Sequence, residues 1–169
     1  MGFDTPSKSG ATIRVPQLVI AALAAFFSFG CSSPAAPGTA GPVAITRLGP
    51  TGRALTAYSG YSQPQRFVVK DSATMALVWE TIYRNVSSRP DMPLVDFTHY
   101  MVLVVALGTR PTTGWDILLD SAVSGSNGLV VYDRIGSPTG GAVLQVITAP
   151  VDVGVVPRMI GPVEFVDRF

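Results

Sequence analysis

The sequence predicts a mainly β domain of α+β class, an antiparallel sheet or sandwich of about seven to eight strands with one packed α-helix. Short apolar runs separated by Gly, Ser, Asn and Pro fill most of the chain after residue 45. Only one stretch there, residues 72–84, has apolar side chains at three- and four-residue spacing instead. The short spacing between runs suits hairpins rather than βαβ crossovers, so the strands should pair antiparallel.

The expected strands follow one another along the chain. They are residues 44–48, 53–58, 66–70, 100–107, 115–123, 129–134, 142–148, 151–156 and 163–167, the first two being the weakest. Residues 100–107 are apolar on both alternating faces, a pattern typical of a strand covered on both sides. We therefore expect this run to be the central strand.

The helix should bury one stripe of side chains. Met75, Val78, Trp79 and Ile82 recur at helical spacing, and Asp71 or Ser72 is placed to cap the N-terminus. Trp79 lies on this stripe, so we interpret it as a core anchor.

Cys31, the only cysteine, follows an apolar run that is preceded by the basic residues Lys8 and Arg14. These are the parts of a bacterial export signal, so residues 1–30 are predicted to be a lipoprotein signal peptide and Cys31 the lipidated residue. A single-pass anchor and an ordinary secretory signal with an incidental cysteine remain alternatives. Lipidation places the protein in the bacterial cell envelope. Because Ser32 is not an inner-membrane retention Asp, the outer membrane or surface is expected if the cell is Gram-negative.

Beyond the signal, residues 31–44 are predicted to form a flexible tether and residues 45–169 one domain. The tether is rich in Ser, Pro, Ala and Gly and carries no charge. From Cys31 onward the basic and acidic residues balance at ten each, without clusters, which argues against a nucleic-acid partner.

The inventory of reactive side chains argues against an enzyme, a metal site or a cofactor. His99 is the only histidine, and no activated nucleophile accompanies it, although Asp96 is spaced to hydrogen-bond it. A zinc site needs several His or Cys ligands. The acids Asp116, Asp120 and Asp133 are interpreted as residues on solvated strand faces.

One loop is a candidate partner-binding site. It follows the most buried strand and consists of Thr109, Arg110, Pro111, Thr112, Thr113, Gly114 and Trp115. Hydroxyls, a fixed Pro and a terminal aromatic would make a stiff polar loop at one end of the sheet, where recognition residues often lie. A purely structural turn is the alternative.

The order of motifs resembles a known family. The motifs are residues 59–61, 66–70, the helix with Trp79, residues 95–97, the loop 108–115, residues 148–150 and residues 156–158. Together they resemble the C-terminal domain family of the protease-complex subunit PrcB, over residues 59–166. Thr113 and Trp115 replace a Gly and a Tyr that the family usually carries. The resemblance implies a binding or accessory role that supports a protease rather than a reaction.

A second resemblance is narrower. Residues 111–114 followed by an aromatic are similar to a loop of the chagasin-type inhibitors of papain-like cysteine proteases, which press three loops into the protease cleft. Gly140-Gly141 matches a second loop, and Pro157-Arg158 is the nearest counterpart of the third.

We therefore expect a non-enzymatic envelope lipoprotein that acts as a protein-binding or protease-accessory module, stabilising its partner. The expected partners are the membrane, through the lipid, and an exported protease or another envelope protein. The alternative is a chagasin-like inhibitor of papain-type proteases.

Overall fold

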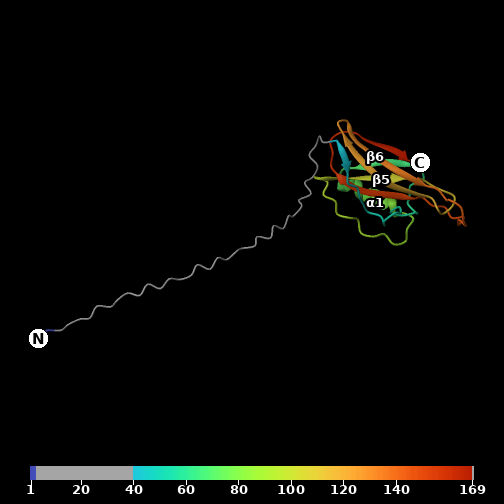
Figure 1. Ribbon diagram of the computed structural model, residues 1–169. Coiled ribbons are helices and arrows are strands. Elements are labelled where there is room, and N and C mark those ends of the chain that lie inside the picture. The colour runs from blue at the N-terminus through green and yellow to red at the C-terminus, as the bar shows by residue number, and fades with distance from the viewer. Residues whose placement is uncertain (3–39, 169) are drawn as a thin grey trace. The chain divides into compact units, whose positions relative to one another are not determined.

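The computed structural model describes residues 1–2 and 40–168 of the chain. Eight strands and one helix lie in the second range (Figure 1). In chain order they are β1 (Gly41–Val43), β2 (Thr46–Arg47), β3 (Gln65–Val69), α1 (Ser72–Ile82), β4 (Tyr100–Ala106), β5 (Asp116–Gly125), β6 (Gly128–Gly136), β7 (Val151–Pro157) and β8 (Val163–Arg168). The predicted mainly β class with one helix is confirmed.

The strands form two four-stranded sheets. One sheet has the order β2-β7-β4-β3, and we call it the middle sheet because it lies between α1 and the other sheet. The other, called the outer sheet, has the order β1-β5-β6-β8. Every pair is antiparallel except β6 and β8, which run parallel from Leu129↔Val163 to Arg134↔Arg168. The parallel pair departs from the expected antiparallel arrangement. It arises because the chain leaves β6 for the middle sheet as β7 before it returns as β8.

The middle sheet is covered on both faces, which confirms β4 as a doubly buried central strand. Val102, Val104 and Ala106 face the core shared with α1. The alternate residues, including Leu103 and Val105, face the core between the two sheets. The domain therefore has three layers, namely α1, the middle sheet and the outer sheet, with β4 contributing to both cores.

Helix α1 begins and packs as its sequence predicts. The Asp71 carboxylate caps it by accepting a hydrogen bond from the Thr74 N–H at 2.8 Å. The four stripe residues are buried, Trp79 among them at 6% exposure, and the Trp79 indole N–H donates to the Pro90 carbonyl at 3.0 Å. The helix ends at Ile82, two residues before the expected end. Trp79 is thus a core residue.

Two expected strands are not formed. Residues 53–58 make only single bridges, Thr56↔Val151 and Tyr58↔Ala149, because bends interrupt the run. Residues 142–147 belong to no strand and are mostly exposed, although Thr148 bridges to Arg110. The strand predicted for residues 142–148 was therefore wrong. The neighbouring loop 109–115 makes only isolated hydrogen bonds with this segment, so no continuous β-ladder forms.

The folded part begins earlier than residue 45. Gly41–Val43, within the segment expected to be tether, forms β1 and pairs with β5 at Gly41↔Ser124, Pro42↔Val123 and Val43↔Ala122. Val43 packs against the core between the sheets. Residues 3–39, which include Cys31 and most of the expected signal peptide and tether, lie outside the described residues.

Two buried aspartates join the sheets. Asp133 on β6 is fully buried and pairs with Arg66 on β3 through contacts of 2.7 and 2.9 Å. Asp152 on β7 is also fully buried, receives two hydrogen bonds from Arg47, and accepts the Leu119 N–H of β5 at 2.9 Å. The interpretation of Asp133 as a solvated residue was wrong, since its side chain turns inward to Arg66.

Candidate partner-binding surface

The candidate loop connects β4 in the middle sheet to β5 in the outer sheet. It starts after Gly108, whose backbone has φ +75°. A Cβ at Gly108 would lie 2.8 Å from backbone atoms of Gln63 and Pro64. Only glycine fits such a left-handed turn at this close approach, so the direction in which the loop leaves β4 is set by Gly108.

The loop is hydrogen-bonded to the segment that follows β6. Arg110 and Thr148 exchange backbone hydrogen bonds of 2.7 and 2.9 Å. The Thr113 N–H donates to the Leu144 carbonyl, and the Leu144 N–H donates to the Thr113 hydroxyl, both at 3.0 Å. The Thr148 hydroxyl donates to the Thr112 carbonyl at 3.0 Å. Residues 110–113 and 144–148 therefore form one hydrogen-bonded unit.

Arg110 and Trp115 lie together at the base of this unit. The Arg110 guanidinium carbon is 5.3 Å from the centroid of the Trp115 ring, within cation–π range. Trp115 is half-buried and packs against the core between the sheets. Trp115 therefore anchors the loop to the domain. The apolar side chains that are exposed to solvent belong to residues of the neighbouring segment after β6.

Exposed apolar side chains gather on the segment after β6. Leu144 is 67% exposed, Val146 41% and Ile147 70%, and Tyr58 at 44% lies close by through the bridge at Ala149. We call residues 109–115 and 137–147 together with Tyr58 the two-loop surface. Sequence reasoning missed the apolar part, since a run such as 142–148 looks like a buried strand when its partner is unknown.

A shallow pocket of about 280 Å³ adjoins the two-loop surface. Its lining comes from residues 58–62, 109 and 147–149 together with Asn85, and none of these residues is charged. Burial raises the pKa of the Tyr61 phenol in this pocket, against the opposing effect of the nearby Arg84 charge. The pocket thus presents neutral hydroxyl and apolar groups.

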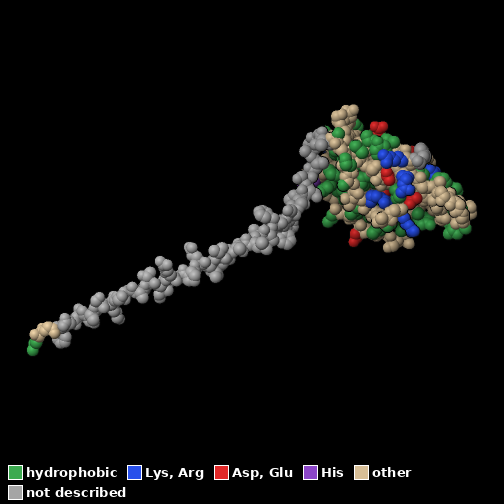
Figure 2. Space-filling view, viewed as in Figure 1, with side chains coloured by type: hydrophobic (Ala, Val, Ile, Leu, Met, Phe, Trp, Pro, Cys, Tyr) green, Lys and Arg blue, Asp and Glu red, His purple; other side chains and the backbone are tan. Residues whose placement is uncertain are grey.

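The two loops at this end of the domain carry a single charge, with Arg84 and Asp116 at their margins. Residues 54–65, 107–115 and 135–151 converge here through the bridges Thr56↔Val151, Tyr58↔Ala149 and Arg110↔Thr148. Within these three segments Arg110 is the only charged residue. The loop after β6 is orange in Figure 1. In the view of Figure 2 it shows hydrophobic side chains (green) and other side chains or backbone (tan).

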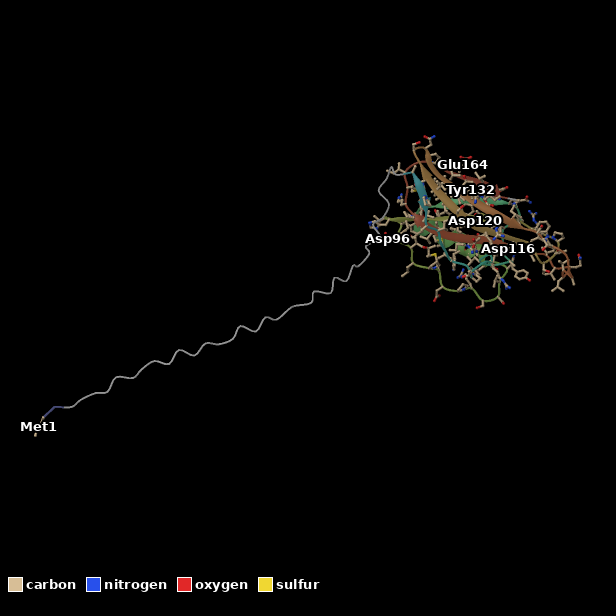
Figure 3. All side chains as sticks on the ribbon, viewed as in Figure 1. Met1, Asp96, Asp116, Asp120, Tyr132 and Glu164 are labelled. Atoms are coloured by element: carbon tan, nitrogen blue, oxygen red, sulfur yellow. The ribbon has the colours of Figure 1, made fainter. Side chains whose placement is uncertain are left out.

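The outer sheet presents a different surface. Blue and red side chains mix on the face seen in Figure 2, and Figure 3 labels Asp116, Asp120, Tyr132 and Glu164 there. Asp120 pairs with Arg168 at 3.2 Å, and the Arg168 guanidinium lies 4.0 Å from the centroid of the Tyr132 ring. Asp116 accepts the backbone N–H groups of Ala54 and Ile117. These acids are engaged in separate contacts, so they do not form a carboxylate pair.

The expected contact between Asp96 and His99 is present. His99 Nδ1 lies 2.6 Å from the Asp96 carboxylate, and both side chains are exposed. This hydrogen bond, with a backbone N–H from Thr98, lowers the pKa of Asp96. The pair precedes β4, at the opposite end of that strand from the candidate loop.

In residues 1–2 and 40–168 no three His, Cys, Asp or Glu side chains are grouped as a metal site would require.

The loops compared with chagasin-type inhibitors do not all meet. Gly114 approaches Pro138, since a Cβ at Gly114 would lie 3.2 Å from the Pro138 ring, so the first two loops are neighbours. Pro157, however, pairs with Tyr100 at the far end of β4. Arg158 there donates to the carbonyls of Lys70 and Phe97. Two of the three loops therefore lie together and the third does not.

The part of the chain that holds both loops spans β4 to β7. Residues 101–157 match the PrcB C-terminal family. This agrees with the family expected from the sequence and associates the segment with a protease-complex module. No curated protein and no solved structure matches the chain.

The PrcB C-terminal match includes all of the loop 109–115 and the segment 137–147, whereas Tyr58 and α1 precede it. Cys31 lies outside both the match and the described residues. Among the helices of the described ranges, none has the length and apolar character of a membrane span.

Proposed function

We propose that this protein is a non-enzymatic, protein-binding module of the bacterial cell envelope that stabilises an exported protease or another envelope protein. The observation that carries the proposal is the two-loop surface, in which apolar side chains stand exposed on a hydrogen-bonded framework. The PrcB C-terminal match covers both loops and supports a protease as the partner.

The geometry suits binding for two reasons. Exposed apolar side chains that lie together are typical of interaction sites, whereas isolated ones are ordinary surface residues. The contacts between Arg110 and Thr148 and between Thr113 and Leu144 hold the two segments before any partner arrives. A surface that is ordered in advance loses less conformational entropy on binding.

The first experiment separates this surface from other exposed apolar residues. The full chain and its Ile147→Asp variant are used to capture proteins from an envelope extract. Ile160→Asp is the matched control, because Ile160 is 96% exposed and lies beyond the opposite end of β7. We expect one partner to be lost with Ile147→Asp and kept with Ile160→Asp, while both variants melt like the wild type.

Equal recovery of every protein by the wild type and by Ile147→Asp would contradict the binding role of this surface. A metal, nucleotide or covalent intermediate found in the purified protein would overturn the non-enzymatic proposal.

The envelope location rests on the signal-like segment before Cys31. The proposal is that Cys31 carries lipid and that the residues after it link the lipid to the domain. Metabolic labelling with a palmitate analogue is expected to mark the wild type and not Cys31→Ala. Unchanged labelling of the variant would reject the lipidation.

Direct inhibition of a papain-like protease is the second candidate. The neighbouring positions of residues 111–115 and Gly140-Gly141 favour it, and the remote position of Pro157-Arg158 weighs against it. Inhibition of papain by the pure protein, lost in Ile147→Asp and kept in Ile160→Asp, would place the module in the inhibitor class.

A further inference from the structure

Arg110 is the only charged residue in the three segments that converge at the two-loop surface. A partner that covers the two-loop surface therefore meets one positive charge among uncharged side chains, while Arg84 lies beside Gly60 at the adjoining pocket. A single carboxylate satisfies the Arg110 charge, whereas a second cation would be repelled and an entirely neutral partner would leave a desolvated charge.

The Arg110 side chain has donors to spare. Nη1 donates to the carbonyl of Thr109 at 3.3 Å, and the buried Nε has no acceptor within the described residues. The donors that a partner can reach are therefore those of the terminal Nη groups. No acidic side chain of the described residues forms an ion pair with Arg110. The planar guanidinium offers paired N–H groups that match the two oxygens of a carboxylate.

The neighbours of Arg110 favour an apolar segment around that carboxylate. Val146 and Ile147 directly precede Thr148, the residue that pairs with Arg110, and Leu144 pairs with Thr113, three residues after Arg110. From residue 135 to residue 151 no charged side chain interrupts this surface. Charged residues in a partner segment would lose their hydration here without gaining a partner.

A second copy of the chain does not meet these requirements through the same surface. Two-fold pairing brings the same patch of both copies together. Each copy would supply Arg110 and, from the two loops, no acid to pair with the Arg110 of the other copy.

We infer that the two-loop surface binds an apolar, uncharged stretch of another protein that carries one carboxylate, and that this carboxylate pairs with Arg110. The inference rests on the proposed binding function and specifies the chemistry of its partner. The carboxylate is that of an Asp or Glu side chain or of a chain end.

The test uses random peptides displayed on phage, selected on the full chain held in mild detergent. We expect the selected peptides to be apolar with a single carboxylate, and to bind Arg110→Gln about tenfold or more weakly, the scale of a hydrogen bond to a charged group. Arg110→Lys should restore part of the affinity, because it keeps the charge and loses the planar pair of donors. Arg89→Gln is the matched control, because Arg89 is exposed and lies outside the three segments.

The two proposals fail in different ways. Peptides that lose affinity for Ile147→Asp but bind Arg110→Gln as tightly as the wild type would overturn the carboxylate inference and leave the binding surface intact. Selection of no peptide that responds to either substitution would reject both. A wild-type dimer in sedimentation that becomes monomeric in Ile147→Asp would show that a second copy occupies the surface, and would overturn the inference.

Discussion

Trp79 joins the helix to the middle sheet and uses both parts of its indole. The ring packs among Met75, Val102 and other buried residues, and its N–H reaches the Pro90 carbonyl. We expect Trp79→Ala to lower the free energy of unfolding by about 3–5 kcal/mol, as large-to-small core changes do. Chemical denaturation measures the change. Leu77→Ala is the control on the same helix, since Leu77 is 68% exposed, and a loss as large there would refute the assignment.

Asp71 makes helix stability depend on pH. Hydrogen bonds from the Thr74 N–H and hydroxyl hold the pKa of Asp71 below the usual 3.8. A lowered folded-state pKa stabilises the fold above the unfolded pKa, and this contribution is lost as pH falls through the folded-state value. The melting difference between the wild type and Asp71→Ala should therefore be present near neutral pH and shrink below pH 3.8.

Asp91→Ala is the control for this experiment, because Asp91 is exposed and lies outside the helix. A melting difference between the wild type and Asp71→Ala that stays constant down to about pH 2, below the unfolded pKa of Asp, would show that the carboxylate does not cap α1.

At the scale of elements, β7 passes close to its neighbours. A Cβ at Gly154 would lie 2.5 Å from the Ile45 Cγ2 and 2.9 Å from the Leu119 Cδ1. Gly154→Ala should therefore destabilise the protein by about 1–3 kcal/mol, the range for an overpacked core. In the control Gly125→Ala the new methyl group meets open space at the end of β5. Equal melting temperatures for the two variants would contradict this packing.

At the scale of the whole molecule, β4 links the two cores into one cooperative unit. Trp79 reports on the core beneath α1, and Trp115 reports on the core between the sheets. They are the only two tryptophans in the chain. Because β4 supplies side chains to both cores, we expect Trp79→Phe and Trp115→Phe each to show one fluorescence transition that coincides with the transition in circular dichroism. Separate midpoints for the two probes within one variant would show that the layers unfold independently.

Elements with a local signal could be predicted from the amino-acid pattern alone. Helix α1 was predicted by apolar spacing and a capping Asp, and β4 by a run apolar on both faces. The loop 109–115 was found because its Gly, Pro and Thr residues stand between two clear strands. The order of the motifs also gave the resemblance to the PrcB C-terminal family, which residues 101–157 match.

The exposure of side chains and the pairing of strands became clear only from the folded domain. Residues 142–148 have the composition of a buried strand, yet Leu144 and Ile147 reach solvent because the loop beside them bonds to Leu144 and Thr148 alone. Asp133 looks like a solvated residue, yet it is buried against Arg66, which is 67 positions away in the chain. Exposure and pairing depend on neighbours that are distant in sequence, so a local pattern does not contain them.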